Sequence, residues 1–267
     1  MNFDCQSISL DIIAKLADRQ APSILIVGPE GCGKSYLARQ FAIKSGIADF
    51  AFVEPTVASI REISELCSEI TTPIVICIEN LDTGVSAASY TLLKFLEEPR
   101  KNVHVVVTAR NITLLPDTIP SRCVTVWMSQ PTERDLLDYA RISAPATKLQ
   151  SILDSAVFKA CRGFTDVTKL LNLTNDQLAY LIRIPTLITA KESLSAVVWK
   201  LTHYADNSPL DSMFALKCIA AAYDGAVRRF CINAITDIQS GRVSAHTAIA
   251  KFIFDCRYAN DLEMIRR

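Results

Sequence analysis

The sequence lacks the features that mark several large classes of protein. It has no run of about 18 apolar residues, so we predict no membrane-spanning helix. Its start, Met1-Asn2-Phe3-Asp4, has no basic segment followed by an apolar run, so we expect no signal peptide. Basic and acidic residues balance at 28 each, which disfavours a protein that coats DNA through bulk positive charge. A few focused phosphate contacts are still compatible with this balance.

The cysteines also lack the spacing of a metal or disulfide framework. There are nine of them, an odd number, and none forms a C-x-x-C pair. The three histidines, His104, His203 and His246, lie far from any cysteine pair in the sequence. We therefore expect reduced thiols, most of them small core residues, in a cytoplasmic protein.

The first 130 residues alternate short apolar runs with helical patterns. The runs are four to six residues long, rich in β-branched side chains and bounded by polar or turn residues, which is typical of buried parallel strands. They are Ile24–Val27, Phe50–Val53, Ile74–Ile78, Val103–Val107 and Val124–Met128, and the helical patterns between them are Tyr36–Ile43, Ile60–Ile70 and Val85–Leu96. This alternation predicts a doubly wound α/β domain with a parallel five-stranded sheet over residues 1–130.

The rest of the chain contains no convincing strand pattern. Helices are expected at 132–141, 147–161, 165–173, 175–182, 189–205, 209–240 and 242–266, with Ser240-Gly241 as a stop signal. We divide this half into a small helical domain at 131–175 and a C-terminal helical domain at 176–267.

A phosphate-binding loop is predicted between the first strand and the following helix. The segment reads Gly28-Pro29-Glu30-Gly31-Cys32-Gly33-Lys34-Ser35 and fits the pattern G-x-x-x-x-G-K-[ST]. Glycines let backbone N–H groups point at phosphate oxygens, and the helix N-terminus adds positive potential. Lys34 is expected to reach the β- and γ-phosphates of ATP and Ser35 to bind Mg²⁺. The alternative is a glycine-rich turn with no ligand.

Three further segments occur in order after the loop. They are Ile60-Arg61-Glu62-Ile63, then Leu92-Leu93-Lys94-Phe95-Leu96-Glu97-Glu98-Pro99, then Ser121-Arg122-Cys123. With the phosphate loop, this series resembles the AAA+ clamp-loader ATPases: the bacterial delta-prime and gamma/tau subunits, the small subunits of replication factor C, and phage equivalents. The resemblance covers about residues 20–130. It implies an AAA+ domain followed by a helical lid and a helical collar that mediates oligomerisation.

The resemblance also implies roles for individual residues. Arg122 matches an arginine finger that reaches the γ-phosphate held by a neighbouring subunit, a task suited to a planar, permanently charged guanidinium. Taken alone, Arg122 could equally be an ordinary surface arginine. Glu79 falls at the position of the Mg²⁺-binding aspartate, and Asn80 at that of the glutamate that activates water. An amide can orient water but cannot accept its proton, so the general base is lost.

Other positions depart from the family pattern or match it weakly. Arg110 falls at the sensor-1 position, where a small polar residue is usual, and Thr108 and Asn111 are possible substitutes. Asp82 is a possible stand-in for the missing carboxylate. The lid segment G-S-x-R or G-D-x-R is best matched by Thr165-Asp166-Val167-Thr168, which puts Thr168 at the sensor-2 position beside Lys169.

Two further expectations concern DNA and a thiol. By resemblance, Ser86, Ser89 and Arg110 are candidates for contact with DNA phosphates, and simple surface roles are equally compatible. Cys32, at a helix N-terminus inside the loop, is predicted to have a lowered pKa, to alkylate faster than buried cysteines and to be protected by ATP. The alternative is that Cys32 fills a small-residue position and is shielded by the fold.

Together these features predict an ATP- and Mg-binding subunit of a DNA sliding-clamp loader. Its expected partners are identical or homologous subunits in a ring, the sliding clamp and primer–template DNA, which it should bind weakly and without sequence specificity. It is expected to act as an ATPase within the assembly, with its own hydrolysis in doubt because of Asn80. The alternatives are another AAA+ motor, such as a helicase loader, and a nucleotide-binding scaffold that does not hydrolyse ATP.

Overall fold

The computed structural model describes residues 3–84, 86–97, 100–144, 149, 152–153, 157–188, 193–203, 211–222, 225–240 and 243–265. The chain divides into two compact units. The first comprises residues 1–135 with 163–165, and the second comprises 136–162 with 166–267.

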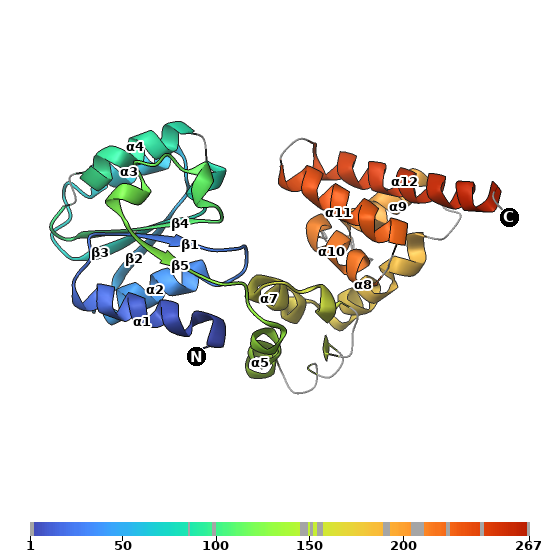
Figure 1. The fold of residues 1–267 in the computed structure, drawn as a ribbon, viewed down its shortest axis with the longest axis horizontal. Coiled ribbons are helices and arrows are strands. Elements are labelled where there is room, and N and C mark those ends of the chain that lie inside the picture. The colour runs from blue at the N-terminus through green and yellow to red at the C-terminus, as the bar shows by residue number, and fades with distance from the viewer. Residues whose placement is uncertain are drawn as a thin grey trace. The chain divides into compact units, whose positions relative to one another are not determined.

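The first unit is built on a parallel five-stranded sheet, as the sequence predicts (Figure 1). Its strands are β1 (Ser23–Val27), β2 (Asp49–Val53), β3 (Ile74–Ile78), β4 (Val103–Ala109) and β5 (Val124–Trp127). They lie in the order β2-β3-β4-β1-β5, and all four neighbouring pairs are parallel. Each of the five predicted strands is confirmed, and β4 extends two residues further than its apolar run indicated.

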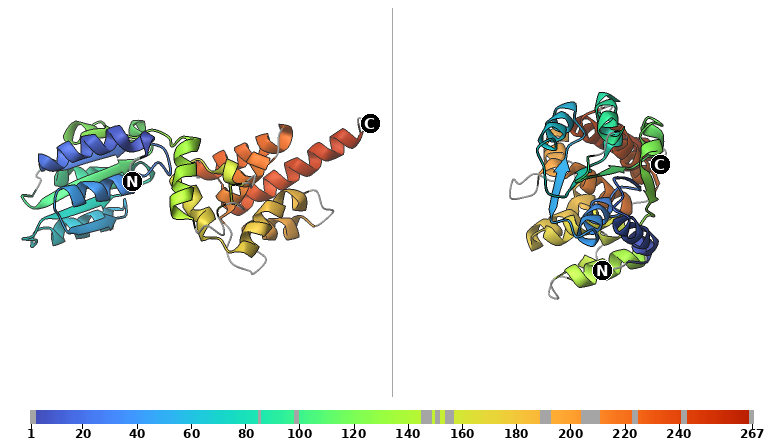
Figure 2. Two further views of the ribbon diagram at one scale, coloured as in Figure 1. Left: turned by 90° about the horizontal axis from the view of Figure 1, so that it is seen from below. Right: turned by 90° about the vertical axis from the view of Figure 1, so that its left-hand side faces the viewer.

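Helices cover both faces of this sheet (Figures 1 and 2), which confirms the doubly wound α/β class. They are α1 (Asp4–Asp18), α2 (Lys34–Lys44), α3 (Val57–Leu66) and α4 (Ser86–Glu97). Because strand side chains alternate between faces, Ile24 and Ile26 pack with α1 and α2, whereas Leu25 and Val27 pack with α3 and α4. Apolar residues therefore fill the strands on both sides, as the uninterrupted apolar runs require.

The helix α1 was not among the predicted elements, although its sequence carries a helical signal. Leu10, Ile13, Leu16 and Ala17 are spaced three or four residues apart and are all buried. This spacing defines one apolar face of a helix, and that face packs against the core cluster shared with α2.

The described elements after residue 132 are helical, as expected. They are α5 (Glu133–Ser143), α7 (Phe164–Asn172), α8 (Asn175–Ile188), α9 (Leu194–Thr202), α10 (Ser212–Ala222), α11 (Gly225–Gln239) and α12 (Ala245–Ile265). Of the predicted helix at 147–161, residues 147–148, 150–151 and 154–156 lie outside the described residues; residues 149, 152 and 153 are helical, and the described end is a 3₁₀ turn, η4 (Phe158–Ala160). None of the described helices combines the length and apolar content needed to cross a membrane.

One predicted helix of the second half was wrong. The pattern over 209–240 indicated a single long helix, but the structure contains two, α10 and α11. The second begins at Gly225, which has a φ of +68° that side chains with a Cβ rarely adopt. A lid domain at 131–175 and a collar domain at 176–267 were predicted, and the boundary between these two domains is still a prediction.

Candidate nucleotide-binding site

The candidate site lies where the carboxyl ends of three neighbouring strands meet. In the sheet order, β4 lies between β3 and β1, and all three run in the same direction. The phosphate loop follows β1, Glu79 and Asn80 follow β3, and Arg110 follows β4. Ligands of open parallel sheets bind at this edge, so the topology brings together segments that are far apart in the sequence.

The phosphate loop has the backbone that its glycines predict. Gly31 and Gly33 have φ values of +74° and +98°, in the region that favours glycine, and Gly33 is the N-cap of α2. Gly28 meets a different constraint, because a Cβ there would lie 2.8 Å from the Cβ of Met128. The loop therefore leads directly into a helix N-terminus, where N–H groups and the helix dipole favour an anion.

Lys34 is buried in this loop and holds its carbonyl groups. Its Nζ donates to the carbonyl oxygens of Gly28, at 2.8 Å, and Pro29, at 2.9 Å. Burial lowers the pKa of Lys34, while the charges of Cys32 and Asp82 act in the opposite direction. The ammonium therefore lies against the loop backbone, where phosphate oxygens would also have to lie.

The prediction for Cys32 was wrong. Its side chain is fully buried, and its Sγ lies 3.9 Å from the sulfur of Met128. Burial raises the pKa of the Cys32 thiol, and the opposing effect of the Lys34 charge is smaller. The thiol therefore points into the core rather than along the helix axis, and the shielded-residue interpretation holds. All nine cysteines are free thiols.

Ser35 and Glu79 meet, as their predicted shared role with Mg²⁺ requires. The hydroxyl of Ser35 donates a hydrogen bond to Oε1 of Glu79, although the two residues are 44 positions apart. One carboxylate and one hydroxyl next to a phosphate cradle form a donor set that suits Mg²⁺, which prefers oxygen ligands and keeps several waters. The longer arm of glutamate thus still reaches the serine.

Asn80 takes a left-handed backbone conformation, which helps to explain why an asparagine occupies this position. Its φ is +49°, in the left-handed region, which asparagine tolerates better than most other residues with a Cβ. Its N–H donates to the hydroxyl of Thr108 at 2.9 Å, and that threonine is buried at the end of β4. The position after Glu79 is therefore fixed by β4 as well as by β3.

The carboxylate of Asp82 binds backbone groups at the end of β4 instead of occupying the position of the missing general base. Its carboxylate accepts hydrogen bonds from the backbone N–H groups of Arg110, at 3.1 Å, and Asn111, at 3.3 Å. It also forms an ion pair with Nε of Arg110 at 3.5 Å. Arg110, the candidate sensor-1 residue, is thus held by a buried carboxylate through both its backbone and its side chain.

Arg122 and the acidic end of α4 form a second cluster. Arg122 lies in the 3₁₀ turn η3 (Pro120–Arg122), and its guanidinium donates to Oε1 of Glu97 at 2.7 Å and to the carbonyl of Thr118 at 3.0 Å. Glu97 belongs to the L-L-K-x-L-E-E-P segment, whose Leu92 and Leu96 are buried in the core. Two of the resemblance segments therefore interact directly.

Three residues at the loop were not predicted. The Nε2 of buried Gln6, on α1, donates to the carbonyl of Cys32 at 2.8 Å. The N–H of Phe164 donates to the carbonyl of Gly31 at 2.8 Å, and a Cβ on Gly163 would lie 2.7 Å from the Cα of Gly31. Gly163 lies two positions before the segment matched to the lid pattern, whereas no sequence signal indicates Gln6.

Several lid and DNA candidates have other contacts. The hydroxyl of Thr168 lies 2.9 Å from that of Tyr139, and Lys169 forms an ion pair with Asp211 at 2.5 Å. Ser89 is 4% exposed, so its proposed contact with DNA is wrong: this side chain faces the core. The side chain of Ser86 lies outside the described residues.

Comparisons with known proteins agree with this geometry. Residues 44–132 match the sequence model of a family described as "DNA polymerase III, delta subunit". The chain is similar to the solved structure of a DNA polymerase III, gamma subunit-related protein from Thermotoga maritima, with a TM-score of 0.55 and 12% identity over 91% of this chain and 97% of that one. It is also similar to the Thermotoga maritima RuvB Holliday junction branch migration motor, with a TM-score of 0.51 and 14% identity over 91% and 78%. No curated protein sequence matches the chain.

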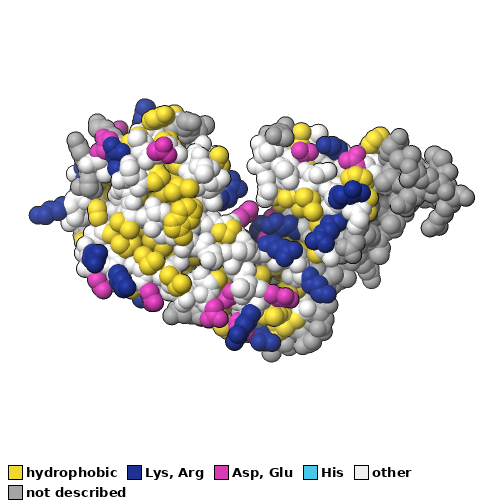
Figure 3. Space-filling model, in the orientation of Figure 1, with side chains coloured by type: hydrophobic (Ala, Val, Ile, Leu, Met, Phe, Trp, Pro, Cys, Tyr) yellow, Lys and Arg dark blue, Asp and Glu magenta, His cyan; other side chains and the backbone are white. Residues whose placement is uncertain are grey.

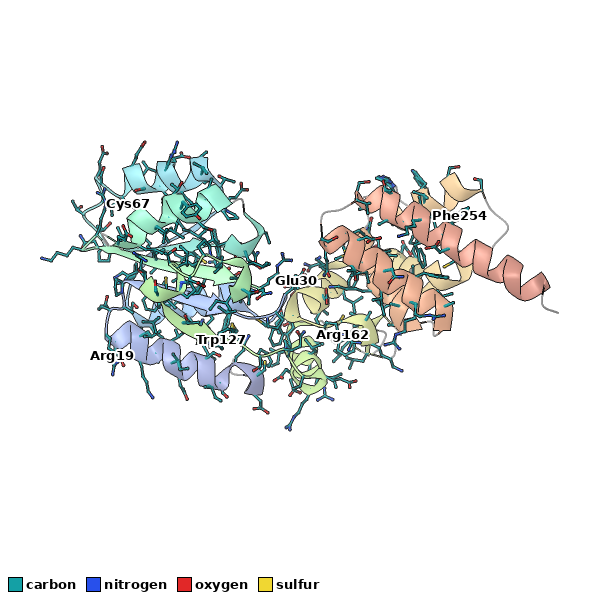
Figure 4. The ribbon with its side chains drawn as sticks, turned by 45° about the horizontal axis from the view of Figure 1, so that its top comes forward. Arg19, Glu30, Cys67, Trp127, Arg162 and Phe254 are labelled. Atoms are coloured by element: carbon teal, nitrogen blue, oxygen red, sulfur yellow. The ribbon has the colours of Figure 1, made fainter. Side chains whose placement is uncertain are left out.

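The chain has the fold of the AAA+ proteins, with a parallel five-stranded α/β unit and a helical C-terminal region. Residues 44–132 are in addition similar to the DNA polymerase III delta-subunit family, and the matched residues include Glu79, the end of α4 and Ser121-Arg122-Cys123. The phosphate loop precedes the matched residues, so the assignment of that loop depends on its own sequence and geometry. Figure 4 labels Glu30 on the phosphate loop and Trp127 at the end of β5.

Proposed function

We propose that this protein is a nucleotide-binding subunit of a DNA sliding-clamp loader, acting in a ring of identical or homologous subunits. The observation that carries the proposal is that its phosphate loop and its candidate finger lie at opposite ends of the sheet. The loop follows the carboxyl end of β1, whereas Arg122 precedes the amino end of β5. The two strands are parallel neighbours, with Ile24 opposite Val124.

The strand geometry separates Arg122 from this chain's own loop. Four strand residues span about 13 Å at roughly 3.3 Å each, and Arg122 lies before all four residues of β5. An arginine at the amino end of the sheet is thus badly placed for a phosphate at its carboxyl end. In a ring, the same residue can face the nucleotide of the next subunit, so we assign Arg122 as a finger that acts in trans.

The ion pair with Glu97 suits such a finger. Both side chains are partly exposed, 32% for Arg122 and 51% for Glu97, and exposed pairs contribute only about 0–1 kcal/mol. Glu97 can therefore orient the guanidinium in the free subunit and still release it to a phosphate. Charge-assisted, bidentate hydrogen bonds from the guanidinium to phosphate oxygens are stronger than this exposed ion pair.

This chain's own site is proposed to bind Mg·ATP with little independent hydrolysis. Bound Mg·ATP supplies the transferable γ-phosphoryl group, which Lys34 and the loop N–H groups would hold while Ser35 and Glu79 contribute oxygens to the metal. Asn80 can orient a water through its amide but cannot take its proton. A scaffold role without hydrolysis is the second candidate, and Asn80 is the observation that favours it.

DNA binding is proposed to be a property of the assembly. The chain has no net charge, so phosphate contacts in the isolated subunit should be weak and should fall with salt. Arg110 remains a candidate contact, tied to Asp82 in this structure. The other alternative, a helicase loader, would share the phosphate loop but has no reason to carry both the L-L-K-x-L-E-E-P segment and Ser121-Arg122-Cys123.

The test of this function is the composition of the native complex. Tagged protein isolated from its native source should co-purify with other AAA+ subunits and with a ring-shaped clamp, as identified by native mass spectrometry. The Arg122→Ala variant should still be isolated but should not support clamp loading in the reconstituted assembly. A native complex that instead contains a hexameric helicase and no clamp would contradict the clamp-loader assignment.

A second prediction tests the role of Asn80. The Asn80→Glu variant restores a carboxylate where water must be activated, so it should raise the ATPase rate of the assembly. The matched control is Asn80→Gln, which lengthens the side chain and bears the same left-handed φ without supplying a base. Replacing asparagine at this left-handed φ costs each variant about 1 kcal/mol of stability, so thermal denaturation should show equal losses. Equal ATPase rates in the two variants would mean that Asn80 is retained for its backbone conformation alone.

A further inference from the structure

The helical unit contains a pocket lined by α10, α11 and the η4 turn. Its volume is about 260 Å³. Four of its lining side chains are basic, Lys159, Arg162, Lys217 and Arg228, and within the described part of the chain none of the lining residues is acidic. The chain as a whole is neutral, with 28 basic and 28 acidic residues, so this is a local concentration of positive charge.

One acidic residue close to the pocket is already engaged. Asp166 is buried, accepts a hydrogen bond from the N–H of Arg162 at 3.0 Å, and forms an ion pair with Lys217 at 3.1 Å. It pairs with Lys217 and so fixes the position of that side chain. Lys and Arg side chains gather visibly on the helical unit in the space-filling view (Figure 3), and Arg162 is labelled in Figure 4.

The pocket also has an apolar wall. Ile232 and Ile235 are spaced three residues apart on α11, one turn after Arg228, so the three side chains lie along one face of the helix. Ile232 is 48% exposed, so its apolar surface is accessible at the pocket. An apolar surface and a basic surface therefore lie side by side in this pocket, and one bound peptide can contact both.

The chemistry of the lining selects a kind of ligand. Proteins that bind single-stranded nucleic acid usually stack bases on aromatic side chains, and no aromatic residue is among the described residues that line this pocket. Isoleucine beside lysine and arginine instead suits a peptide that carries an apolar side chain between carboxylates. We propose that this pocket binds an acidic segment of a partner protein, with an apolar side chain against Ile232 and Ile235 and flanking carboxylates near the basic lining residues, Arg228 among them.

The test uses the full chain and a labelled, end-capped peptide of Asp-Asp-Leu repeats. Fluorescence anisotropy should show binding that weakens as salt is raised, because screening reduces exposed charge pairs. The Arg228→Ala variant should weaken binding about tenfold, which corresponds to about 1.4 kcal/mol. Arg229→Ala is the matched control, because Arg229 is the next residue of α11, is also exposed and does not line the pocket. It should bind the peptide as the unmodified chain does.

A second variant and two further probes make the result decisive. Ile232→Gln keeps a side chain of similar length and removes its apolar surface, so it should also weaken binding of the peptide, whereas a peptide with serine in place of leucine should bind poorly to every variant. Circular dichroism should show the same melting for all of them. Equal affinity in Arg228→Ala and Arg229→Ala, no binding of the peptide, or tighter binding of an oligothymidine strand that depends on Arg228 would each overturn the proposal.

Discussion

Replacing Lys34 with alanine should weaken binding of Mg·ATP by more than tenfold, a loss of at least about 1.4 kcal/mol. The reason is the geometry of the loop, in which the Lys34 ammonium is buried and lies within 2.9 Å of two loop carbonyls. Alanine would remove the proposed main cationic contact to the β- and γ-phosphates and would also leave the carbonyls of Gly28 and Pro29 without this donor. Isothermal titration calorimetry on the purified chain would measure the change.

The same helix provides the control for this experiment. Lys44 is exposed in the last turn of α2, at the end remote from the loop. Lys44→Ala removes an equal charge from the same element, so it should leave the affinity for ATP unchanged. If Lys34→Ala binds ATP as tightly as Lys44→Ala does, the loop does not hold the phosphates and the proposed nucleotide site is wrong.

Removing the guanidinium of Arg122 should have the largest effect on turnover. In the reconstituted assembly, Arg122→Ala should lower ATP hydrolysis at the site that the arginine serves, by up to roughly 10³–10⁵-fold if it acts as fingers do in other nucleotide hydrolases. Clamp loading should fall with it. The affinity of the variant for its own ATP should stay within about twofold of the unmodified chain, because Arg122 lies at the opposite end of the sheet from the loop.

Two controls separate a finger from a structural arginine. Arg19→Ala removes an exposed arginine at the end of α1 and should leave the assembly fully active. Glu97→Gln removes the charge that Arg122 pairs with and should leave assembly turnover largely intact, because the guanidinium itself remains. If the isolated subunit hydrolyses ATP rapidly and Arg122→Ala abolishes that activity, the arginine acts in cis and the proposed mechanism fails.

The sheet and its neighbouring loop were predictable because their signals are local. Five β-branched runs became five strands, since a chain that alternates such runs with amphipathic helices can bury them only in a parallel, doubly wound sheet. The loop was predictable because Gly31 and Gly33 occupy backbone conformations that favour glycine. The pairing of Ser35 with Glu79 followed from the parallel topology, which places both at one edge.

Errors arose where the environment of a residue decides its behaviour. Helix position alone predicted a reactive Cys32, but its thiol is buried in the core, and burial raises its pKa by more than the Lys34 charge lowers it. Ser89 was expected at a surface and faces the core. The helix predicted over 209–240 is two helices, α10 and α11, and the apolar periodicity that continues from one into the other concealed the division.

The sequence by itself determined the strands, the phosphate loop and the residues that resemble clamp-loader segments, because each depends on neighbours within a few positions of the chain. Only the tertiary structure decided what those residues contact. The distance between Arg122 and the loop depends on strand order, the contact of Gln6 with Cys32 on how α1 packs, and the basic pocket on the approach of η4 to α10 and α11. Such contacts join residues tens or hundreds of positions apart, and no local pattern encodes them.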